Sequence, residues 1–224
     1  GESASSMFRR VAAAVKPGME ASFFRIMDDL LFLPNSPTLM NAGTTRGQLS
    51  ACFVLPVADS IPGIFTALTQ MAVIHKSGGG TGFSFSRIRP AGDRVGTIPG
   101  VASGPLPFLH VFDEATAALK QGGKRRGANM GVLASSHPDI LSFIREKKKG
   151  GLKNFNLSVG FDRHFFDTLA RNGTYDLVNP RDGEVWDTLD AALLWEALCA
   201  AAWQCGDPGV LFLDRINEKN PVPG

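Results

Sequence analysis

The feature that most constrains the fold is a regular alternation of short apolar runs with helical patterns. Five runs are apolar or alternate between apolar and polar residues, as strands do; they cover 49–56, 83–88, 129–134, 155–161 and 210–214. Apolar residues recur at helical spacing between the first three runs, over 61–72 and 108–119. This order predicts an α/β fold with a parallel sheet and right-handed crossovers, whose ligands gather beyond the carboxyl ends of the strands.

Four further segments have readable local signals. Residues 138–150 form the best-signalled helix, with Ser136 as the capping residue ahead of it and Gly150 as its stop. A last helix over 188–205 is apolar on most sides, so we expect it to be buried. A small β-ribbon over 175–185 turns at 179–183, and a helical segment covers about 6–32.

Composition excludes several classes of protein. The chain has 224 residues, 44% of them hydrophobic and 20% charged, which is typical of a globular protein. The net charge of +2 gives no basic excess for binding a nucleic-acid polymer. No apolar run reaches the length of a bilayer span or a secretory signal, so we expect a cytoplasmic protein without membrane contact.

The cysteines and histidines indicate neither a disulfide framework nor a metal site. There are three cysteines, an odd number with no CxxC pair, and the four histidines lack metal-ligand spacing. Cys199 and Cys205 lie in the apolar helix and are interpreted as structural. Cys52 is either a core residue or a redox thiol, which would need a partner with its Cα about 4.4–6.8 Å away.

Two loops have compositions that admit a structural or a functional interpretation. Residues 33–43 contain two prolines, two asparagines and two hydroxyl residues, which suit a rigid irregular turn or a loop that binds phosphate. Residues 77–82 contain a glycine cluster that lets a backbone approach a ligand closely. Because these glycines precede a strand and do not open a helix, they do not match a dinucleotide fingerprint.

The polar candidates outside these loops point to anions. Residues 120–131 combine four cations with glycines and do not match a Walker A loop, which favours anion recognition over simple compensation of a helix dipole. Asp59 and Ser60 open a helix as an N-cap or contact a ribose or phosphate. Arg87 and Arg89 share one face of a strand, toward phosphate or solvent.

Six segments, taken in order, resemble the catalytic chain of ribonucleotide reductases. They are residues 33–43, 49–54, 77–82, 87–93, 121–132 and 206–221. The strings PNSPTLMNAG and GGKRRGANMG look most like the adenosylcobalamin-dependent, or class II, branch, with the iron-dependent branch as the alternative. The resemblance implies a ten-stranded α/β barrel of two five-stranded parallel halves. We therefore expect 33–224 to form the first half, after a helical lead-in over 1–32.

The resemblance also assigns residues. Cys52 is one member of the thiol pair that reduces the substrate, and its partner lies beyond residue 224, as does an Asn-Pro-Cys-Gly-Glu-type motif with the radical cysteine. The residues aligned with substrate contacts are Ser36, Ala51 and Gly80. Those aligned with an allosteric site for deoxynucleoside triphosphates, and with the loop that reports its occupancy, are Asp59, Ser60, Ile61, Arg89, Lys120, Gln121 and Arg125.

The implied activity is conversion of ribonucleoside diphosphates to deoxyribonucleotides by thiyl-radical chemistry. The implied partners are adenosylcobalamin, a thiol reductant such as thioredoxin, the second half of the barrel, and a second copy of the chain docked through the helices near 61–76 and 105–120. The chain begins at Gly1 and stops inside a loop, so we expect a fragment that is inactive alone. The alternative is a stand-alone nucleotide-binding or interaction module without catalysis.

Overall fold

The computed structural model describes residues 1–45, 47–95, 101–119 and 127–222, and its centre is a parallel sheet. Five strands pair in the order β1-β2-β3-β4-β7, all parallel. They are β1 (Cys52–Leu55), β2 (Gly80–Ser84), β3 (Asn129–Ala134), β4 (Phe155–Phe161) and β7 (Gly209–Phe212). The predicted α/β class and the five-stranded parallel sheet are confirmed, and the strands fall close to the predicted runs.

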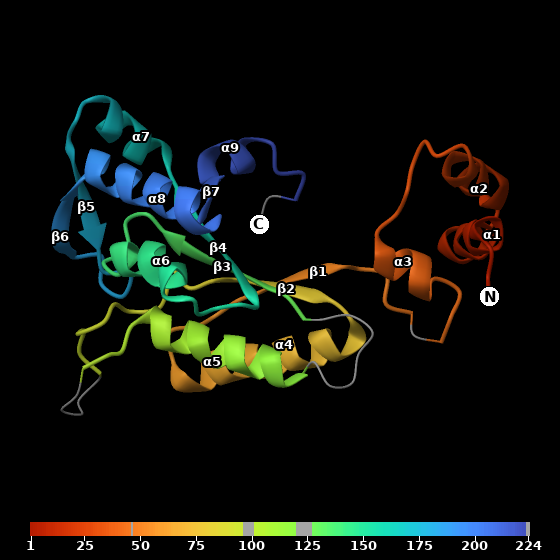
Figure 1. The fold of residues 1–224 in the computed structure, drawn as a ribbon, viewed down its shortest axis with the longest axis horizontal. Helices are drawn as coiled ribbons and strands as arrows, with labels where there is room; N and C mark the ends of the chain where they lie inside the picture. Colours follow the sequence, from red (N-terminus) through yellow and green to blue (C-terminus); the bar gives the residue numbers. More distant parts are fainter. Residues whose placement is uncertain (46, 96–100, 120–126, 223–224) are drawn as a thin grey trace.

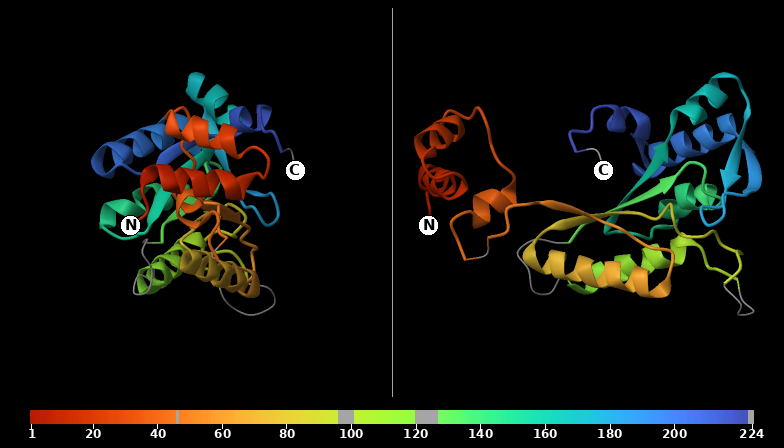
Figure 2. Two further views of the ribbon diagram at one scale, coloured as in Figure 1. Left: turned by 90° about the vertical axis from the view of Figure 1, so that its right-hand side faces the viewer. Right: turned by 180° about the vertical axis from the view of Figure 1, so that it is seen from behind.

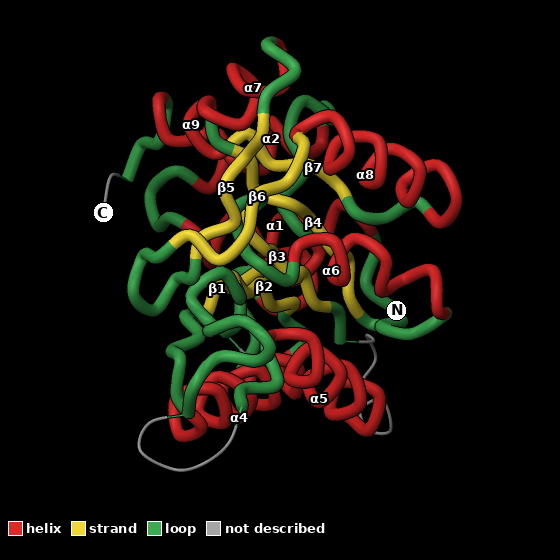
Figure 3. Tube along the Cα trace, turned by 90° about the vertical axis from the view of Figure 1, so that its left-hand side faces the viewer, coloured by secondary structure: helices red, strands yellow, loops and turns green. Residues whose placement is uncertain are grey.

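Helices cover one face of this sheet. They are α4 (Ile61–Ser77), α5 (Pro105–Ala118), α6 (Ile140–Glu146), α7 (Arg163–Ala170) and α8 (Ala191–Cys205). Figure 3 shows the strands as an arc, with α4 and α5 below it and α6 and α8 on its right. Phenylalanines from β2, β4 and α5 meet in the core, where the Phe83 and Phe112 rings pack edge to face at 5.0 Å.

The opposite face of the sheet is largely open. Side chains alternate across a strand, so Cys52 and Val54 of β1 point to the same side, and Val54 is 87% exposed. The register places Cys52 beside Gly80 and Gly82 beside Met130 on this face. Parallel sheets are normally covered on both faces. This face therefore has the geometry that the inner face of a barrel half would have.

The N-terminal helices form a separate small cluster beyond the amino ends of the strands (Figures 1 and 2). They are α1 (Ala4–Val15), α2 (Glu20–Asp28) and α3 (Ser36–Asn41). Their apolar cluster runs from Phe8 to Ala42. The prediction that 33–43 is an irregular loop is wrong, because Asn35 caps α3 by accepting from Thr38 N at 2.9 Å and Pro37 suits its first turn. The boundary expected at residue 32 stays a prediction.

The ribbon and the last helix differ from their predicted bounds. The ribbon pairs β5 (Thr174–Val178) with β6 (Val185–Asp190), so 188–190 is strand and α8 begins only at Ala191. Asp190 ends the strand and caps α8 by accepting from Ala192 N. The expectation that this helix is buried is also wrong: one face packs into the core, but Trp203 is 87% exposed and Cys199 and Cys205 are exposed.

Two local predictions change around the carboxyl ends of β2 and β3. The second strand begins at Gly80, inside the glycine cluster, and ends at Ser84, so Arg87 and Arg89 lie in the following turn and not on a strand face. The cap of α6 is Asp139, not Ser136, and its carboxylate accepts from Ala91 N at 2.9 Å instead of capping its own helix. A short 3-10 helix, Lys147–Lys149, follows α6 and ends at Gly150, as predicted.

None of the helices in the described ranges combines the length and the apolar character that a bilayer crossing requires.

Candidate functional site

The first group of candidate residues lies at the amino ends of β1 and β2. Gly80 N donates to Ala51 O at 2.7 Å, and Gly80 is the register partner of Cys52. The thiol of Cys52 is free and exposed on the open face. Because Gly80 has no side chain, nothing from β2 covers the sulfur at this point. The thiol is thus available to a molecule lying on the open face.

Ser36 is connected to this group through α3. It is the exposed first residue of the helix. Thr38 of the same helix donates to Leu49 O at 2.9 Å, and Asn41 Nδ2 donates to Gln48 O at 2.8 Å. These bonds fasten α3 to the segment that leads into β1. Ser36, Ala51 and Cys52 are therefore carried by neighbouring parts of the structure.

The position of this group differs from one expectation, which stays a prediction. Ligands were expected beyond the carboxyl ends of the strands, but Ala51, Cys52 and Gly80 lie at the amino ends. The carboxyl-end rule applies to sheets with helices on both faces, where loops are the accessible part of the sheet. Here one face is open, so residues at either end of a strand can meet a ligand.

A buried polar network supports the amino ends from the covered side. His75 near the end of α4 lies 3.0 Å from Thr81 Oγ1, Thr81 donates to Asn129 Oδ1 at 2.6 Å, and Asn129 Nδ2 donates to Thr116 at 2.8 Å. Since the Thr81 proton goes to Asn129, His75 donates through Nε2. Its Nδ1 is then a buried acceptor that lacks a hydrogen-bond partner among the described residues. Burial lowers the pKa of His75.

The second group of candidates lines a pocket near the carboxyl ends of β1 and β2. Asp59 and Arg89 form an ion pair with Oδ2 and Nε 2.8 Å apart, and each side chain is 23% exposed. Ser60 caps α4 by accepting from Gly63 N at 3.1 Å, which confirms the N-cap interpretation. The pocket holds about 380 Å³ and is lined by Asp59, Ser60, Ile61, Ile64, Ile88, Arg89, Val95, Val101, Ala102, Ser103, Gly104 and Phe108.

Two helix N-termini meet at this pocket. Ser60 and Ile61 belong to the start of α4, and Gly104 is the N-cap of α5, with φ of 74° and no side-chain cap. Helix N-termini carry partial positive charge and free N–H groups, so the pocket favours an anionic ligand. The Arg89 guanidinium adds a donor group, although its positive charge is offset by the paired Asp59 carboxylate. The volume is within the range of small-molecule sites.

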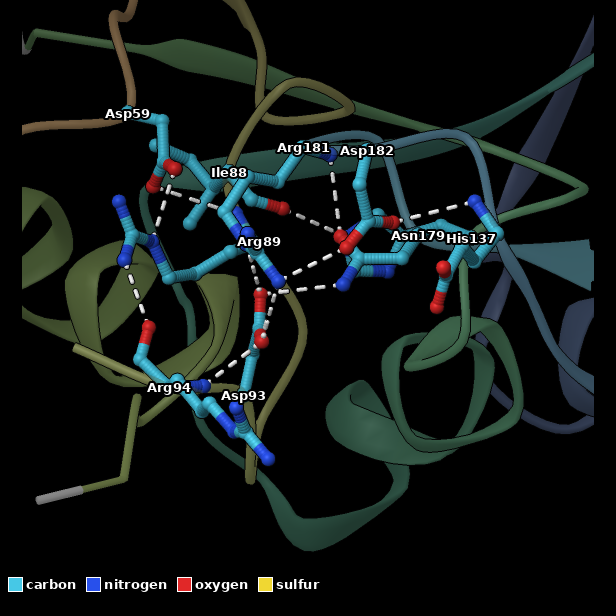
Figure 4. A network of polar contacts seen from close by, with 10 residues as sticks. Asp59, Ile88, Arg89, Asp93, Arg94, His137, Asn179, Arg181 and Asp182 are labelled. Carbon is cyan, nitrogen blue, oxygen red and sulfur yellow. Dashed lines mark hydrogen bonds and ion pairs between the residues drawn. The ribbon is translucent and has the colours of Figure 1, made fainter. Parts of the chain in front are cut away.

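The loop that follows β2 is fixed by polar contacts that the sequence did not reveal (Figure 4). Asp93 accepts from Arg181 Nε at 2.7 Å and from Asn179 Nδ2 at 3.0 Å, both on the turn of the β5–β6 ribbon. His137 Nε2 lies 2.8 Å from Ile88 O. The sequence predicted only a turn at 179–183, and no local signal connects it to Asp93.

Some predicted residues lie outside the residues that the structure describes. Lys120, Gln121 and Arg125 fall in 120–126, which the structure does not describe. In the described part of the chain, no three histidine, cysteine, aspartate or glutamate side chains gather to hold a metal ion.

Comparison with known proteins gives a consistent result. A family model described as "Ribonucleotide reductase, barrel domain" matches residues 50–224, and one described as "Ribonucleotide reductase, all-alpha domain" matches residues 1–47. The chain is 57% identical over 202 residues to a vitamin B12-dependent ribonucleoside-diphosphate reductase of Thermoplasma acidophilum, covering 89% of this chain and 26% of that protein.

Two further relatives are less similar to this chain. A protein of the same description from Mycobacterium tuberculosis is 49% identical over 233 residues, covering 100% of this chain and 33% of that protein. A ribonucleoside-diphosphate reductase large subunit of Monkeypox virus is 29% identical over 226 residues, covering 88% of this chain and 29% of the viral protein. The chain thus spans about a quarter to a third of the length of these relatives.

Proposed function

Because the chain belongs to the ribonucleotide reductase family, we propose that it forms the first half of the catalytic barrel in a vitamin B12-dependent ribonucleoside-diphosphate reductase. The two B12-dependent relatives described above support this choice over the iron-dependent branch. The complete enzyme converts ribonucleoside diphosphates to deoxyribonucleotides. This chain supplies one redox thiol and an allosteric pocket.

The observation that carries the proposal is the exposed thiol of Cys52 on the open face of the sheet, beside Gly80. Replacing a ribose hydroxyl by hydrogen needs two electrons. Two thiols supply them: both are oxidised, a disulfide forms, and the hydroxyl leaves as water. Cys52 provides one thiol. Cys199 and Cys205 lie on α8, which packs against the covered side of the sheet, so the second thiol comes from outside these residues.

The remaining substrate contacts follow from position. Ser36 and Ala51 are carried by segments that adjoin the thiol, and we assign them to the substrate diphosphate. Gly80 leaves room beside Cys52 for the ribose or base, because even a Cβ added at this position would approach Ala128 O only to 3.4 Å. Binding the substrate here places the sugar next to the sulfur. The radical chemistry starts from a cysteine outside this chain.

The pocket at the carboxyl ends is assigned to the deoxynucleoside triphosphate effector. The phosphates are attracted by the two helix N-termini and Arg89, while the Asp59 carboxylate, an acceptor, suits a sugar hydroxyl. Ser60 and Ile61 line the pocket. Lys120, Gln121 and Arg125, which lie outside the described residues, are assigned the role of passing the response to effector toward the substrate.

The proposed dimer uses α4 and α5. These helices expose several apolar side chains, which a second copy would cover: Ile61, Phe65, Val73 and Val111. Ile61 also lines the pocket, so the effector and the second copy of the chain would both contact this residue. We therefore expect effector binding to change the affinity of dimerisation, and dimerisation to change the affinity for effector.

Adenosylcobalamin would supply the initiating radical to the complete enzyme. The pocket described above does not fit it, because its volume of about 380 Å³ lies at the low end of small-molecule sites and a corrin ring is large. We therefore give these residues no contact with the cofactor. A thiol reductant such as thioredoxin regenerates the dithiol from the disulfide, and a cytoplasmic location is part of the proposal.

A single-turnover experiment tests the role of Cys52. The complete enzyme is reduced, freed of external thiol, and given substrate and adenosylcobalamin, and its cysteines are then mapped by alkylation and mass spectrometry. We expect Cys52 in a disulfide, in proportion to the deoxynucleotide formed, and Cys199 as a free thiol. Product formation with Cys52 still alkylatable would refute the assignment.

One observation favours the alternative of a nucleotide-binding module, because the described residues alone build the pocket around Asp59 and Arg89. Calorimetry of the 224-residue chain with deoxynucleoside triphosphates separates the two. Micromolar binding by this chain, together with a failed single-turnover test, would favour the module. Disulfide formation at Cys52 would exclude it as the sole function.

A further inference from the structure

We propose that Arg181 and Asn179, on the turn of the β5–β6 ribbon, are positioning residues of the effector pocket, which they hold in shape through Asp93. The inference rests on the proposed function, since it concerns regulation at the same pocket. The inference extends the site to the β5–β6 ribbon, whose residues are not among those that line the pocket. Figure 4 shows the contacts that connect the two.

Asp93 is the centre of the arrangement. Its side chain is 2% exposed, and it accepts from Arg181 Nε at 2.7 Å, Arg181 Nη2 at 3.0 Å and Asn179 Nδ2 at 3.0 Å. The guanidinium of Arg181 holds the pKa of Asp93 well below its usual range, with help from Asn179. A buried carboxylate without these donors would be strongly destabilised, so the pair is required once Asp93 is buried.

Asp93 organises the loop between β2 and α5. Its carboxylate accepts from Arg94 N at 2.7 Å, and its carbonyl accepts from Ala102 N at 2.7 Å. Gly92 N donates to Ala102 O at 2.8 Å, and Arg94 pairs with Val101 in an antiparallel bridge. Both sides of the loop are therefore tied at Asp93. Val101 and Ala102 line the pocket, so their positions depend on this tie.

The same contacts reach the ion pair of the pocket. Arg89 Nη1 donates to Arg94 O at 2.8 Å, while its Nε lies 2.8 Å from the Asp59 carboxylate. The N–H of Arg94 thus donates to Asp93, and the carbonyl of Arg94 accepts from Arg89. A continuous chain of hydrogen bonds runs from Arg181 through Asp93 and Arg94 to Arg89.

The ribbon does not need Asp93 for its own fold. Val178 N donates to Ser136 O at 2.7 Å, and the Tyr175 hydroxyl lies 3.1 Å from Ser135 Oγ. Arg181 is itself 40% exposed. The start of the loop has separate anchors, because His137 binds Ile88 O and Asp139 accepts from Ala91 N. Loss of Arg181 should therefore loosen the pocket wall without unfolding the ribbon.

The test compares four variants of the complete enzyme. Arg181→Met removes the donors, Arg181→Lys keeps the charge with one point of contact, and Arg89→Met alters the pocket itself. Arg171→Met is the matched control, since Arg171 precedes the same ribbon and, among the described residues, its side chain bonds only the carbonyl of Asp167, one turn earlier. The readouts are the effector concentration at half-maximal response, the KM of the substrate and the melting temperature.

We expect Arg181→Met to raise the half-maximal effector concentration about tenfold while the KM moves less than about twofold. Arg181→Lys should fall between it and the parent, and Arg171→Met should match the parent. If Arg89→Met has no effect on effector response, the proposed function of the pocket fails. If Arg89→Met weakens effector and Arg181→Met does not, only the positioning role fails. If Arg181→Met raises the KM of the substrate by the same factor as the half-maximal effector concentration, its role is merely structural and the proposal is also overturned.

Discussion

The two ends of the parallel sheet are built in opposite ways. At the carboxyl ends, Asp59 and Arg89 are paired, and the surrounding loop is cross-linked by hydrogen bonds. At the amino ends, Cys52 has an exposed, unpaired thiol, and its neighbour Gly80 offers only backbone. One end has fixed polar partners and the other leaves its reactive group open.

The difference fits two kinds of task. A pocket that discriminates among effectors needs preorganised donors, because every group left to be ordered costs affinity. A thiol that gives electrons to a substrate needs access and room for the reacting atoms. The same sheet can serve both, because its ends are separated by the length of the strands. The following predictions test whether this division is correct, beginning with the largest effect.

Replacing the thiol should have the largest effect. Cys52→Ser in the complete enzyme removes one of the two reducing groups, so steady-state turnover should fall by a factor on the order of 10³. Effector binding should stay within about twofold of the parent, because the change lies at the opposite end of the sheet. Cys199→Ser, another exposed cysteine, is the control and should keep full turnover. Turnover of Cys52→Ser near the parent rate would refute the assignment of a redox thiol to the amino end of the sheet.

Adding a methyl group beside the thiol should have the next effect. In Gly80→Ala the new Cβ would meet Ala128 O at 3.4 Å and Ala51 O at 3.6 Å, which are ordinary contacts, so the fold should tolerate it. The methyl group would occupy space next to Cys52, and the KM of the substrate should rise by about tenfold. Steady-state kinetics and a urea unfolding curve measure the two quantities.

Gly82→Ala serves as the matched control, because it adds a methyl group to the same face two residues along, with Met130 Cβ 3.9 Å away. We expect its KM to change less than that of Gly80→Ala. Equal KM values for both variants would indicate that the region beside Cys52 is not specific for substrate.

Local sequence signals predicted the sheet but not the bonds between its loops. The apolar runs predicted the strands. Ser60, which stands directly before the helical pattern, predicted the cap of α4. The helix at Ser36–Asn41 was missed because two prolines suggested an irregular loop, whereas Asn35 caps it. Periodicity also could not separate 188–190 from the helix after it, since strand pairing with Thr174 decided that boundary.

The candidate site divides in the same way. Cys52 and Asp59 could be chosen from sequence, because the resemblance aligned them and their neighbours have readable roles. The pair of Asp93 and Arg181 could not, because 88 residues separate them and the ribbon turn gives only a turn signal. Contacts between loops depend on how the layers pack, and no local pattern encodes that packing.

Each end of the sheet also contains a buried histidine, which gives a test by pH. Burial lowers the pKa of both His75 and His137. Below the unfolded value of about 6.5 the unfolded chain binds protons that the folded chain does not. The free energy of unfolding should therefore be highest above that pH and should fall as the pH drops toward the lowered folded pKa, by no more than about 1.4 kcal/mol per histidine for each pH unit.

The two histidines can be separated by substitution. His75→Gln keeps a donor toward Thr81, and His137→Gln keeps one toward Ile88 O, so each variant should retain its fold and show a shallower loss of stability with acid. Urea unfolding at several pH values measures the slopes. If neither variant changes the slope, protonation of His75 and His137 does not cause the loss of stability in acid. A change in one alone would assign the acid sensitivity to that end.

The smallest expected effect separates capping from ligand binding at Ser60. Its hydroxyl accepts from Gly63 N, so Ser60→Ala should lower the free energy of unfolding by about 1 kcal/mol, whereas Ser60→Gly should cost only a few tenths of a kcal/mol. If the hydroxyl only caps α4, both variants should bind effector as tightly as the parent once folded. If both lose effector affinity by the same large factor although their stabilities differ, Ser60 contacts the ligand directly. The capping hydroxyl at the carboxyl end would then also be a ligand group. Both ends of the sheet would in that case present a side chain directly to their ligand.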